Sequence, residues 1–215
     1  QHLQADFIAR QILADFSGLS VNSSTQQHAA RIVFGPDYRA PQSKFNYKDL
    51  AEDFPGYTYG YDETKKRMTS TYKGEEVGEG GLVRAKPGMW TNVVLLDVAS
   101  MHPTSIEVLE LFGDYTKNFV AIMQLRLAIK RGDYDAARKM FDGKLAPYLD
   151  NEELAEALSY ALKIVINIVY GLTAASFENA FRDPRNIDNI VAKRGALFML
   201  DLMLEVEARG FTVAH

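Results

Sequence analysis

Apolar residues recur at helical spacing in the first part of the chain. In residues 3–16 they repeat every three to four positions, which is the spacing of an amphipathic helix, and Gly18 follows as a stop signal. A second, shorter helix is predicted to begin at the capping residues Ser23, Ser24 and Thr25 and to run through Val33. Gly35-Pro36 would end it, so the chain is expected to open with two helices.

The same spacing predicts most of the second half of the chain to be helical. Pro103 suits the first turn of a helix that stops at Gly113. Further helices are predicted at 115–130, 133–140, 152–177 and 187–209, the last closed by Gly210. We expect the helices at 115–130 and 152–177 to form an antiparallel pair.

Two short segments have the pattern of β-strands. Val93-Val94-Leu95-Leu96 is a continuous apolar run that predicts a buried strand, and it leads directly into Asp97. Phe211-Thr212-Val213 is predicted to start another strand. Residues 36–90 lie between the first two helices and the run at 93–96. They are rich in Pro, Gly, Tyr and charged residues, which predicts loop and short strand. The expected fold class is α+β.

Composition narrows the possible functions. The 215 residues include no cysteine, which excludes disulfides and thiolate metal sites and fits a reducing cytoplasm. Uninterrupted apolar runs fall far short of the roughly 20 residues that span a bilayer, so no membrane partner is expected. The net charge of −4 predicts no overall affinity for nucleic acid, so any basic surface must be local, with 117–144 as the best candidate. The start at Gln1 is interpreted as an internal cut, with partner segments missing.

The predicted helix at 152–177 carries a line of polar residues. Lys163, Asn167 and Tyr170 fall within an arc of roughly 60°, counted at about 100° per residue, opposite the apolar positions. A cation, an amide and a phenol in this order suit a phosphate tail, a sugar and a base, and Gly171 would allow close backbone approach. An ordinary amphipathic helix explains the same spacing.

Two other groups could bind an anion or a metal ion. Arg126 and Lys130 are four residues apart, so they share a helix face and could hold an anion at two points. Asp97 follows a predicted strand and precedes a helix start, where Mg²⁺ could be ligated beside the backbone amides of Ser100 and Met101. A solvated helix face and a turn-capping aspartate are the structural alternatives.

The order of these residues resembles a known family. Residues 97–103, Asp-Val-Ala-Ser-Met-His-Pro, resemble motif A of the family B DNA polymerases, and Lys163, Asn167, Tyr170 and Gly171 match motif B. Arg126 and Lys130 look like the basic pair on the other fingers helix of that family. The sequence around Gly80-Gly81 looks most like that of the bacteriophage branch of the family.

The resemblance implies a fold and a division of the chain. It implies an α+β fold with a partial polymerase palm sheet, packed helices and an antiparallel two-helix fingers subdomain. Residues 1–114 would be the N-terminal part of the palm, with an irregular insertion at 36–90 and the motif A strand. Residues 115–172 would be the fingers helices, and 173–215 a palm helix and the start of the motif C hairpin strand.

The resemblance also implies roles for individual residues in two-metal phosphoryl transfer. Asp97 and the Val98 carbonyl would hold Mg²⁺, and Lys163 would act on the leaving pyrophosphate. The deoxynucleoside triphosphate (dNTP) would be bound by Ser100, Met101, His102, Arg126, Lys130, Lys163 and Asn167. Tyr170, Gly171, Gly80 and Gly81 would contact the base pair or the primer–template DNA.

Several positions depart from the family pattern. The second catalytic carboxylate of the family lies in an Asp-Thr-Asp hairpin that would follow His215. The chain alone is therefore expected to be inactive. Its expected partners are the remaining parts of the polymerase, namely the exonuclease, the motif C palm and the thumb. His102 replaces the tyrosine that packs under the sugar, Ile168 replaces a serine, and Gly78 stands where a tyrosine is expected. A family A polymerase is disfavoured because Tyr170-Gly171 follows Lys163 rather than Lys130. A non-catalytic interaction module or degenerate subunit with this fold is the remaining alternative.

Overall fold

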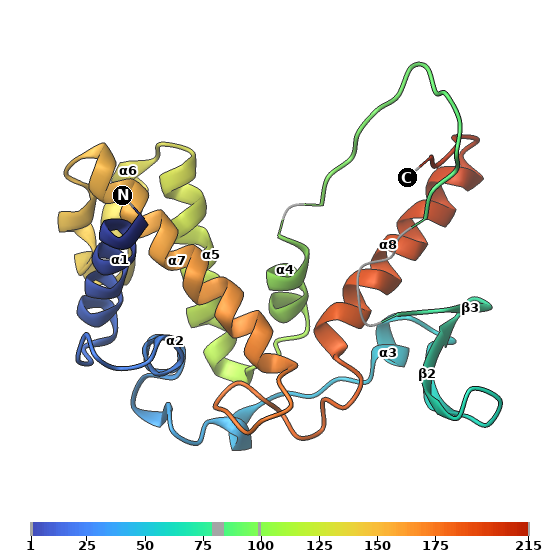
Figure 1. Ribbon diagram of the computed structural model, residues 1–215, viewed down its shortest axis with the longest axis horizontal. Helices are drawn as coiled ribbons and strands as arrows, with labels where there is room; N and C mark the ends of the chain where they lie inside the picture. The colour runs from blue at the N-terminus through green and yellow to red at the C-terminus, as the bar shows by residue number, and fades with distance from the viewer. Residues whose placement is uncertain (1, 79–83, 99, 215) are drawn as a thin grey trace. The chain divides into compact units, whose positions relative to one another are not determined.

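The computed structural model describes residues 2–78, 84–98 and 100–214, and the side chains from residue 6 onward in those ranges. In this part of the chain the fold is mostly helical α+β, with eight α-helices and a small three-stranded antiparallel sheet (Figure 1). The contacts divide the chain into two compact units. Unit 1 comprises residues 1–46 and 106–183, and unit 2 comprises 47–105 and 184–215. The units are described separately below, and the subdomain boundaries at 114 and 172 remain a prediction.

Unit 1 is built from five helices and four short 3₁₀ turns. The helices are α1 (His2–Ser17), α2 (Thr25–Phe34), α5 (Thr116–Lys130), α6 (Tyr134–Lys139) and α7 (Glu152–Thr173). The 3₁₀ turns within it are at Gly35–Asp37, Gln42–Lys44, Gly113–Tyr115 and Ala146–Leu149, with a further distorted turn at Met140–Gly143. The start of α2 is fixed by a capping box between Ser24 and Gln27, and Ser24 is one of the three predicted capping residues.

Aromatic rings fill much of the core of unit 1. Phe34 lies at the centre of this cluster, with its ring centroid 4.8 Å from that of Phe181 and 5.6 Å from that of Phe112. Phe45 and Phe119 extend the cluster on either side of Phe112. The cluster connects α2, α5 and the segment after α7, because these rings come from all three.

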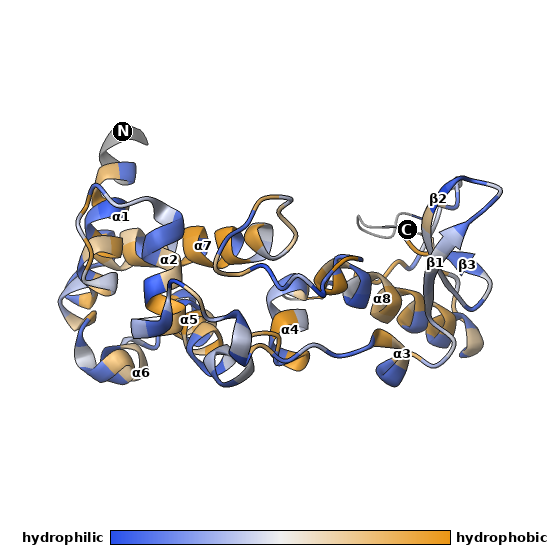
Figure 2. Cartoon of the chain, turned by 90° about the horizontal axis from the view of Figure 1, so that it is seen from below, coloured by the Kyte–Doolittle hydropathy of each residue, from blue (hydrophilic) through white to orange (hydrophobic). Residues whose placement is uncertain are grey.

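The helix α7 packs through one face only. It contacts α1, α2 and α5, and Figure 2 shows hydrophobic residues along the helix. The following positions of α7 are buried: Ala155, Leu158, Ala161, Leu162, Val165, Ile166, Val169, Leu172 and Thr173. By length and composition alone α7 could also cross a membrane, since an 18-residue window has a mean hydropathy of 1.3. Its apolar positions repeat as a face that packs against neighbouring helices, which is the arrangement of a core helix.

A close backbone contact joins the two halves of the unit 1 sequence. Gly113 has φ +57°, and a Cβ atom there would lie 2.1 Å from the carbonyl oxygen of Lys44. Only glycine fits both the backbone conformation and the space. The turn before α5 therefore lies directly against the 3₁₀ turn at Gln42–Lys44.

Unit 2 combines the sheet with one long helix. Strands β1 (Thr58–Asp62), β2 (Arg67–Tyr72) and β3 (Glu75–Glu76) form an antiparallel sheet in the order β1-β2-β3, in which Thr58 pairs with Thr71. The helices are α3 (Leu50–Asp53), α8 (Ile190–Ala208) and the first residues of α4 (Met101–Val108), which runs on into unit 1. In the described part of 36–90, loop and short strand are found as predicted, but the short helix α3 was not predicted, and 79–83 lie outside the described residues.

Polar bonds fasten this sheet to α8. The Tyr57 hydroxyl donates to Asp188 over 2.8 Å, and the Tyr72 hydroxyl donates to Asp201 over 3.1 Å. The buried Lys193 ammonium donates to the Val77 carbonyl over 2.8 Å. Because these residues are buried or half-buried, the bonds fix where the sheet lies along α8.

The predicted strands at 93–96 and 211–213 are wrong. Neither segment is part of a strand in the described chain, and Val93, Val94, Leu95 and Leu96 are 67–89% exposed. A continuous apolar run is typical of a strand that is buried in a sheet, and no described strand pairs with this one. Asp97 therefore does not follow a strand, and the observed sheet is formed by 58–76 instead.

The helix predictions are confirmed with small shifts at the ends. The helix predicted at 152–177 ends at Thr173, and the helix predicted from Ile187 begins at Ile190, after an Asn189 cap with φ 53°. The predicted helix after Pro103 ends at Val108, before Gly113. The helix α6 occupies the stretch predicted at 133–140, capped by Asp133.

A buried histidine makes the stability of unit 1 depend on pH. His28 on α2 is fully buried, and its Nδ1 lies 2.7 Å from the Ser17 hydroxyl. Burial, with the nearby Arg10 charge, lowers the pKa of His28 below its ordinary value of 6.5. The imidazole is therefore neutral in the folded protein at neutral pH.

We predict that the free energy of unfolding falls as the pH drops below about 6.5. The unfolded chain takes up a proton at His28 there, whereas the folded chain does so only at the lower pKa, so stability is lost between the two values. Urea unfolding followed by helical circular dichroism between pH 5 and 8 measures this. His28→Gln should flatten the profile, and an equal slope in both proteins would contradict the assignment.

Candidate functional site

The exposed face of α7 carries the polar residues singled out in the sequence. Asn151 caps the helix by accepting a hydrogen bond from the Leu154 amide over 2.9 Å. Lys163 and Asn167 are exposed, Tyr170 is half-buried, and all three lie opposite the buried positions of the helix. The prediction that one face packs while the other is presented is confirmed for α7.

The residues on this face differ in burial and in their hydrogen bonding. Within the described residues, Lys163 and Asn167 have neither an ion pair nor a side-chain hydrogen bond. Burial raises the pKa of the Tyr170 phenol, so it stays protonated at neutral pH. A Cβ atom at Gly171 would meet nothing within 4 Å, so the surface is open at this position.

The helix α5 adds two cations beside α7. Lys130 is exposed, and Arg126 is half-buried. The Nε atom of Arg126 is buried and has no hydrogen-bond partner in the described part of the chain. Burying a guanidinium nitrogen without a hydrogen-bond partner costs free energy, and an acceptor that reached this nitrogen would remove that cost.

The packing of α5 on α7 places these cations on two neighbouring helices. The two helices contact each other and run in opposite directions (Figure 1). Lys130 and Ser159 line the same cavity, so this part of α7 lies beside the end of α5. Arg126 lies one turn before Lys130 on α5, and Lys163 lies one turn after Ser159 on α7. We call Arg126, Lys130, Lys163 and Asn167 the α5–α7 polar face.

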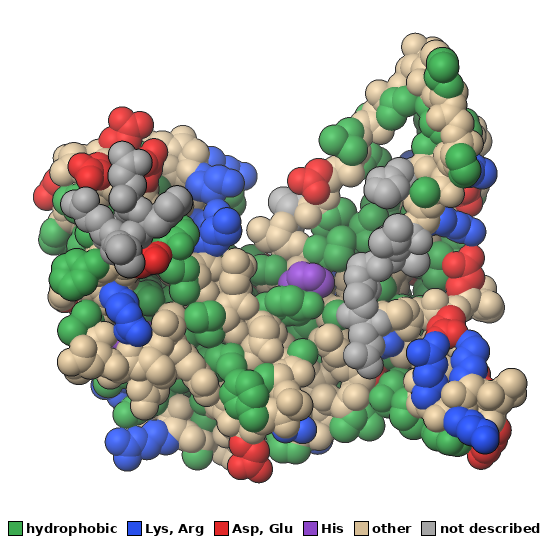
Figure 3. Space-filling view, viewed as in Figure 1, with side chains coloured by type: hydrophobic (Ala, Val, Ile, Leu, Met, Phe, Trp, Pro, Cys, Tyr) green, Lys and Arg blue, Asp and Glu red, His purple; other side chains and the backbone are tan. Residues whose placement is uncertain are grey.

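Cationic side chains gather over the upper part of α5 in Figure 3. A second basic cluster in that view covers the turn between β1 and β2 in unit 2. There, however, Arg67 pairs with Glu76 at 2.9 Å, and Lys65 also pairs with Glu76. The hairpin charges are thus neutralised by neighbouring carboxylates, whereas no such pairing is found for Lys130 and Lys163 among the described residues.

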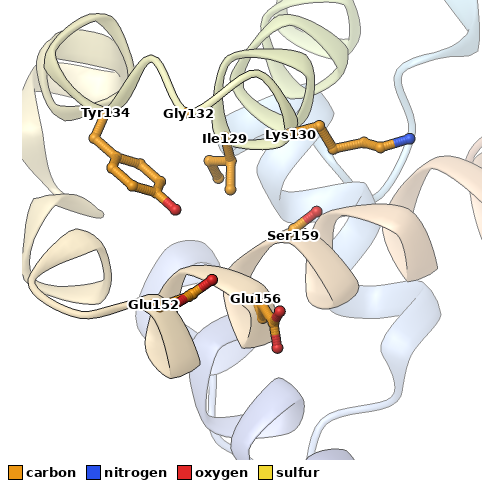
Figure 4. Close-up of a pocket in the computed structure, with 7 residues that line it drawn as sticks. All are labelled: Ile129, Lys130, Gly132, Tyr134, Glu152, Glu156 and Ser159. Carbon is orange, nitrogen blue, oxygen red and sulfur yellow. The ribbon is translucent and has the colours of Figure 1, made fainter.

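A cavity of about 330 Å³ lies at the end of the α5–α7 polar face. Ile129, Lys130 and Gly132 line it from the end of α5, Tyr134 from α6, and Glu152, Glu156 and Ser159 from α7. Figure 4 shows the Lys130 side chain extending away from Glu152 and Glu156, on the side of Ser159. The ammonium therefore does not point into the acidic end of the cavity.

The motif A residues all lie in unit 2. Asp97 is exposed and Val98 is half-buried. Ser100 has φ 54°, a backbone conformation that is strained for a residue other than glycine. It directly precedes Met101, the first residue of α4, whose early amides have no partner within the helix.

His102 follows in the first turn of α4. It is half-buried, and burial lowers the pKa of its imidazole below the ordinary value of 6.5. The ring is therefore neutral at neutral pH and presents a flat surface without charge.

Oxygen ligands at Asp97 suit Mg²⁺, which binds one or two carboxylates and takes further ligands from substrate phosphates. Within the described residues no three His, Cys, Asp or Glu side chains come together as a metal site. Asp97 is thus the single exposed carboxylate that this segment offers to such a metal ion.

The structure brings the predicted residues together in two groups. Arg126, Lys130, Lys163, Asn167, Tyr170 and Gly171 share unit 1, and Asp97, Val98, Ser100, Met101 and His102 share unit 2. Gly80 and Gly81 lie outside the described residues.

Sequence reasoning did not identify the residues at the end of the polar face. Glu152, Glu156 and Ser159 are spaced by four and three residues, which places them on one helix face, and this was the available signal.

Comparison with protein-family models, with curated proteins and with solved structures gave no match.

Proposed function

We propose that this chain is the fingers and part of the palm of a family B DNA polymerase, which binds an incoming dNTP with Mg²⁺. The observation that carries the proposal is the position of Arg126 and Lys130 on α5 and of Lys163 on α7, two helices that pack against each other. The rest of the assignment depends on the resemblance of residues 97–103 and 163–171 to motifs A and B.

The α5–α7 pair would be the two-helix fingers subdomain. Positive charges at successive turns, about 5.4 Å apart along a helix, suit the phosphates of a triphosphate tail. Lys163 would contact the phosphates that leave as pyrophosphate, and Asn167 would follow them toward the sugar. Tyr170 and Gly171 would lie against the base pair, where a neutral phenol and an open surface allow stacking.

By the resemblance, the residues similar to motif A would bind nucleotide from the palm. Asp97 and the Val98 carbonyl would hold Mg²⁺, which neutralises charge on the triphosphate. The backbone N–H groups of Ser100 and Met101 would donate to phosphate oxygens at a helix start. His102 would lie under the sugar as a flat, neutral ring.

A non-catalytic interaction module is the second candidate. It is favoured by the run Val93–Leu96, whose four side chains are exposed although a soluble protein rarely exposes contiguous apolar surface. Such a module would bind a partner protein without any requirement for nucleotide. Affinity for a triphosphate distinguishes the two candidates.

We predict that Lys163→Ala weakens binding of dATP in the presence of Mg²⁺ by about tenfold, the effect of losing one charge-assisted hydrogen bond. Isothermal titration calorimetry of the 215-residue chain measures the dissociation constant. Lys117→Ala is the matched control, because Lys117 is exposed on α5 and lies about 180° around the helix from Arg126. Equal affinity of a folded Lys163→Ala protein and the wild type would reject the fingers assignment.

We predict that His102→Ala reduces the preference for dATP over ATP. Removing the ring would open space for the 2′-hydroxyl, so the ratio of the two dissociation constants should shift by about tenfold toward ATP. His102→Phe keeps a flat ring and should retain the preference. A ratio that is the same in all three proteins would show that His102 does not contact the sugar.

A further inference from the structure

The first turn of α4 is held from one side by α8. Both belong to unit 2, where α8 carries Arg194 and Gly195 in its first half. A Cβ atom at Gly195 would lie 2.8 Å from the Sδ atom of Met101 and 3.1 Å from its Cγ atom. The Met101 side chain thus occupies the space that a Cβ atom at position 195 would need.

No other feature of the described residues explains a glycine at position 195. Gly195 is buried inside a 19-residue helix, where glycine destabilises the helix by about 1 kcal/mol relative to alanine. Its φ is not positive, so the backbone conformation does not require glycine. The close approach of Met101 is the contact that alanine would disturb.

A second link joins the same elements. The Ser105 hydroxyl is fully buried and donates to the Met101 carbonyl over 3.0 Å. The Arg194 guanidinium donates to this hydroxyl over 3.4 Å. Burial lowers the pKa of Arg194, and its Nε has no hydrogen-bond partner among the described residues, so a charged group is kept here at a cost.

These links converge on a turn that is itself strained. Ser100, next to Met101, has φ 54°, and a strained conformation persists only when the surrounding structure holds it. The packing at Gly195 and the bond through Ser105 both act on Met101, the neighbour of the strained residue.

We propose that Gly195 and Ser105 are positioning residues for this turn: they hold Ser100 and Met101 so that their backbone N–H groups face a phosphate of the bound nucleotide. The inference rests on the proposed function, because it takes the nucleotide as the ligand. Neither residue contacts the ligand, so each acts only through the position of Met101.

Gly195→Ala tests the proposal, since a new methyl group would displace the flexible Met101 side chain without removing any residue of the site. Gly60→Ala is the matched control, because a Cβ atom there meets nothing within 4 Å. In the double variant Gly195→Ala/Met101→Ala the conflicting Sδ and Cγ atoms are gone. Amide hydrogen exchange of residues 100–105 reports the turn, calorimetry reports affinity for dATP with Mg²⁺, and the thermal midpoint reports folding.

We expect Gly195→Ala to speed exchange at residues 100–105 and to weaken dATP binding by about tenfold, with the double variant restoring affinity. Gly60→Ala should change neither quantity.

Unchanged exchange in Gly195→Ala would overturn the proposal whether or not dATP binds. Faster exchange with unchanged dATP affinity would overturn it as well, because the turn would then have only a structural role. A wild-type chain that binds no dATP would reject the proposed function, and this result is read independently of the exchange data.

Discussion

The packing of the apolar face of α7 is the constraint on which the arrangement of unit 1 depends. Leu158, Leu162, Val165 and Val169 are fully buried and repeat at three and four residues, so the helix can rotate little about its axis. The rotation that buries them leaves Lys163 and Asn167 exposed. Because α5 packs against the same helix, the position of Arg126 and Lys130 follows from that packing too.

The polar face therefore depends on the core and not on local bonds. Lys163 is not held by any ion pair among the described residues, and its position comes from the backbone of α7. The aromatic cluster around Phe34 and the contact of Gly113 with Lys44 fix the segments at the other end of α5. The core thus fixes the backbone that carries these cations, while the exposed lysine side chains keep their rotamer freedom until a ligand binds.

The helices could be predicted from the sequence because their signals are local. The capping box at Ser24 and the apolar period of α7 lie within a few residues of the elements that they define. The run at Val93–Leu96 has an equally clear pattern, yet a strand depends on partners distant in sequence, which the described chain does not provide. The apolar pattern indicates that the segment could be a strand, but whether a strand forms depends on pairing with other strands.

The candidate site was predictable only in part for the same reason. Spacing within one helix places Lys163 beside Asn167, but the level at which α5 meets α7 is a property of packing. The contact of Gly195 with Met101 joins positions 94 residues apart, since 195 − 101 = 94, and no pattern around either residue indicates it. Such contacts require coordinates.

The central claim is that the α5–α7 polar face binds a triphosphate, and a nuclear magnetic resonance titration tests it most directly. The amide resonances of the chain would be followed while dATP and Mg²⁺ are added. The account predicts saturable shifts in unit 1 that centre on Arg126, Lys130, Lys163 and Asn167. Shifts in unit 1 that centre instead on the helices α1 and α2, with those four residues unmoved, would contradict it.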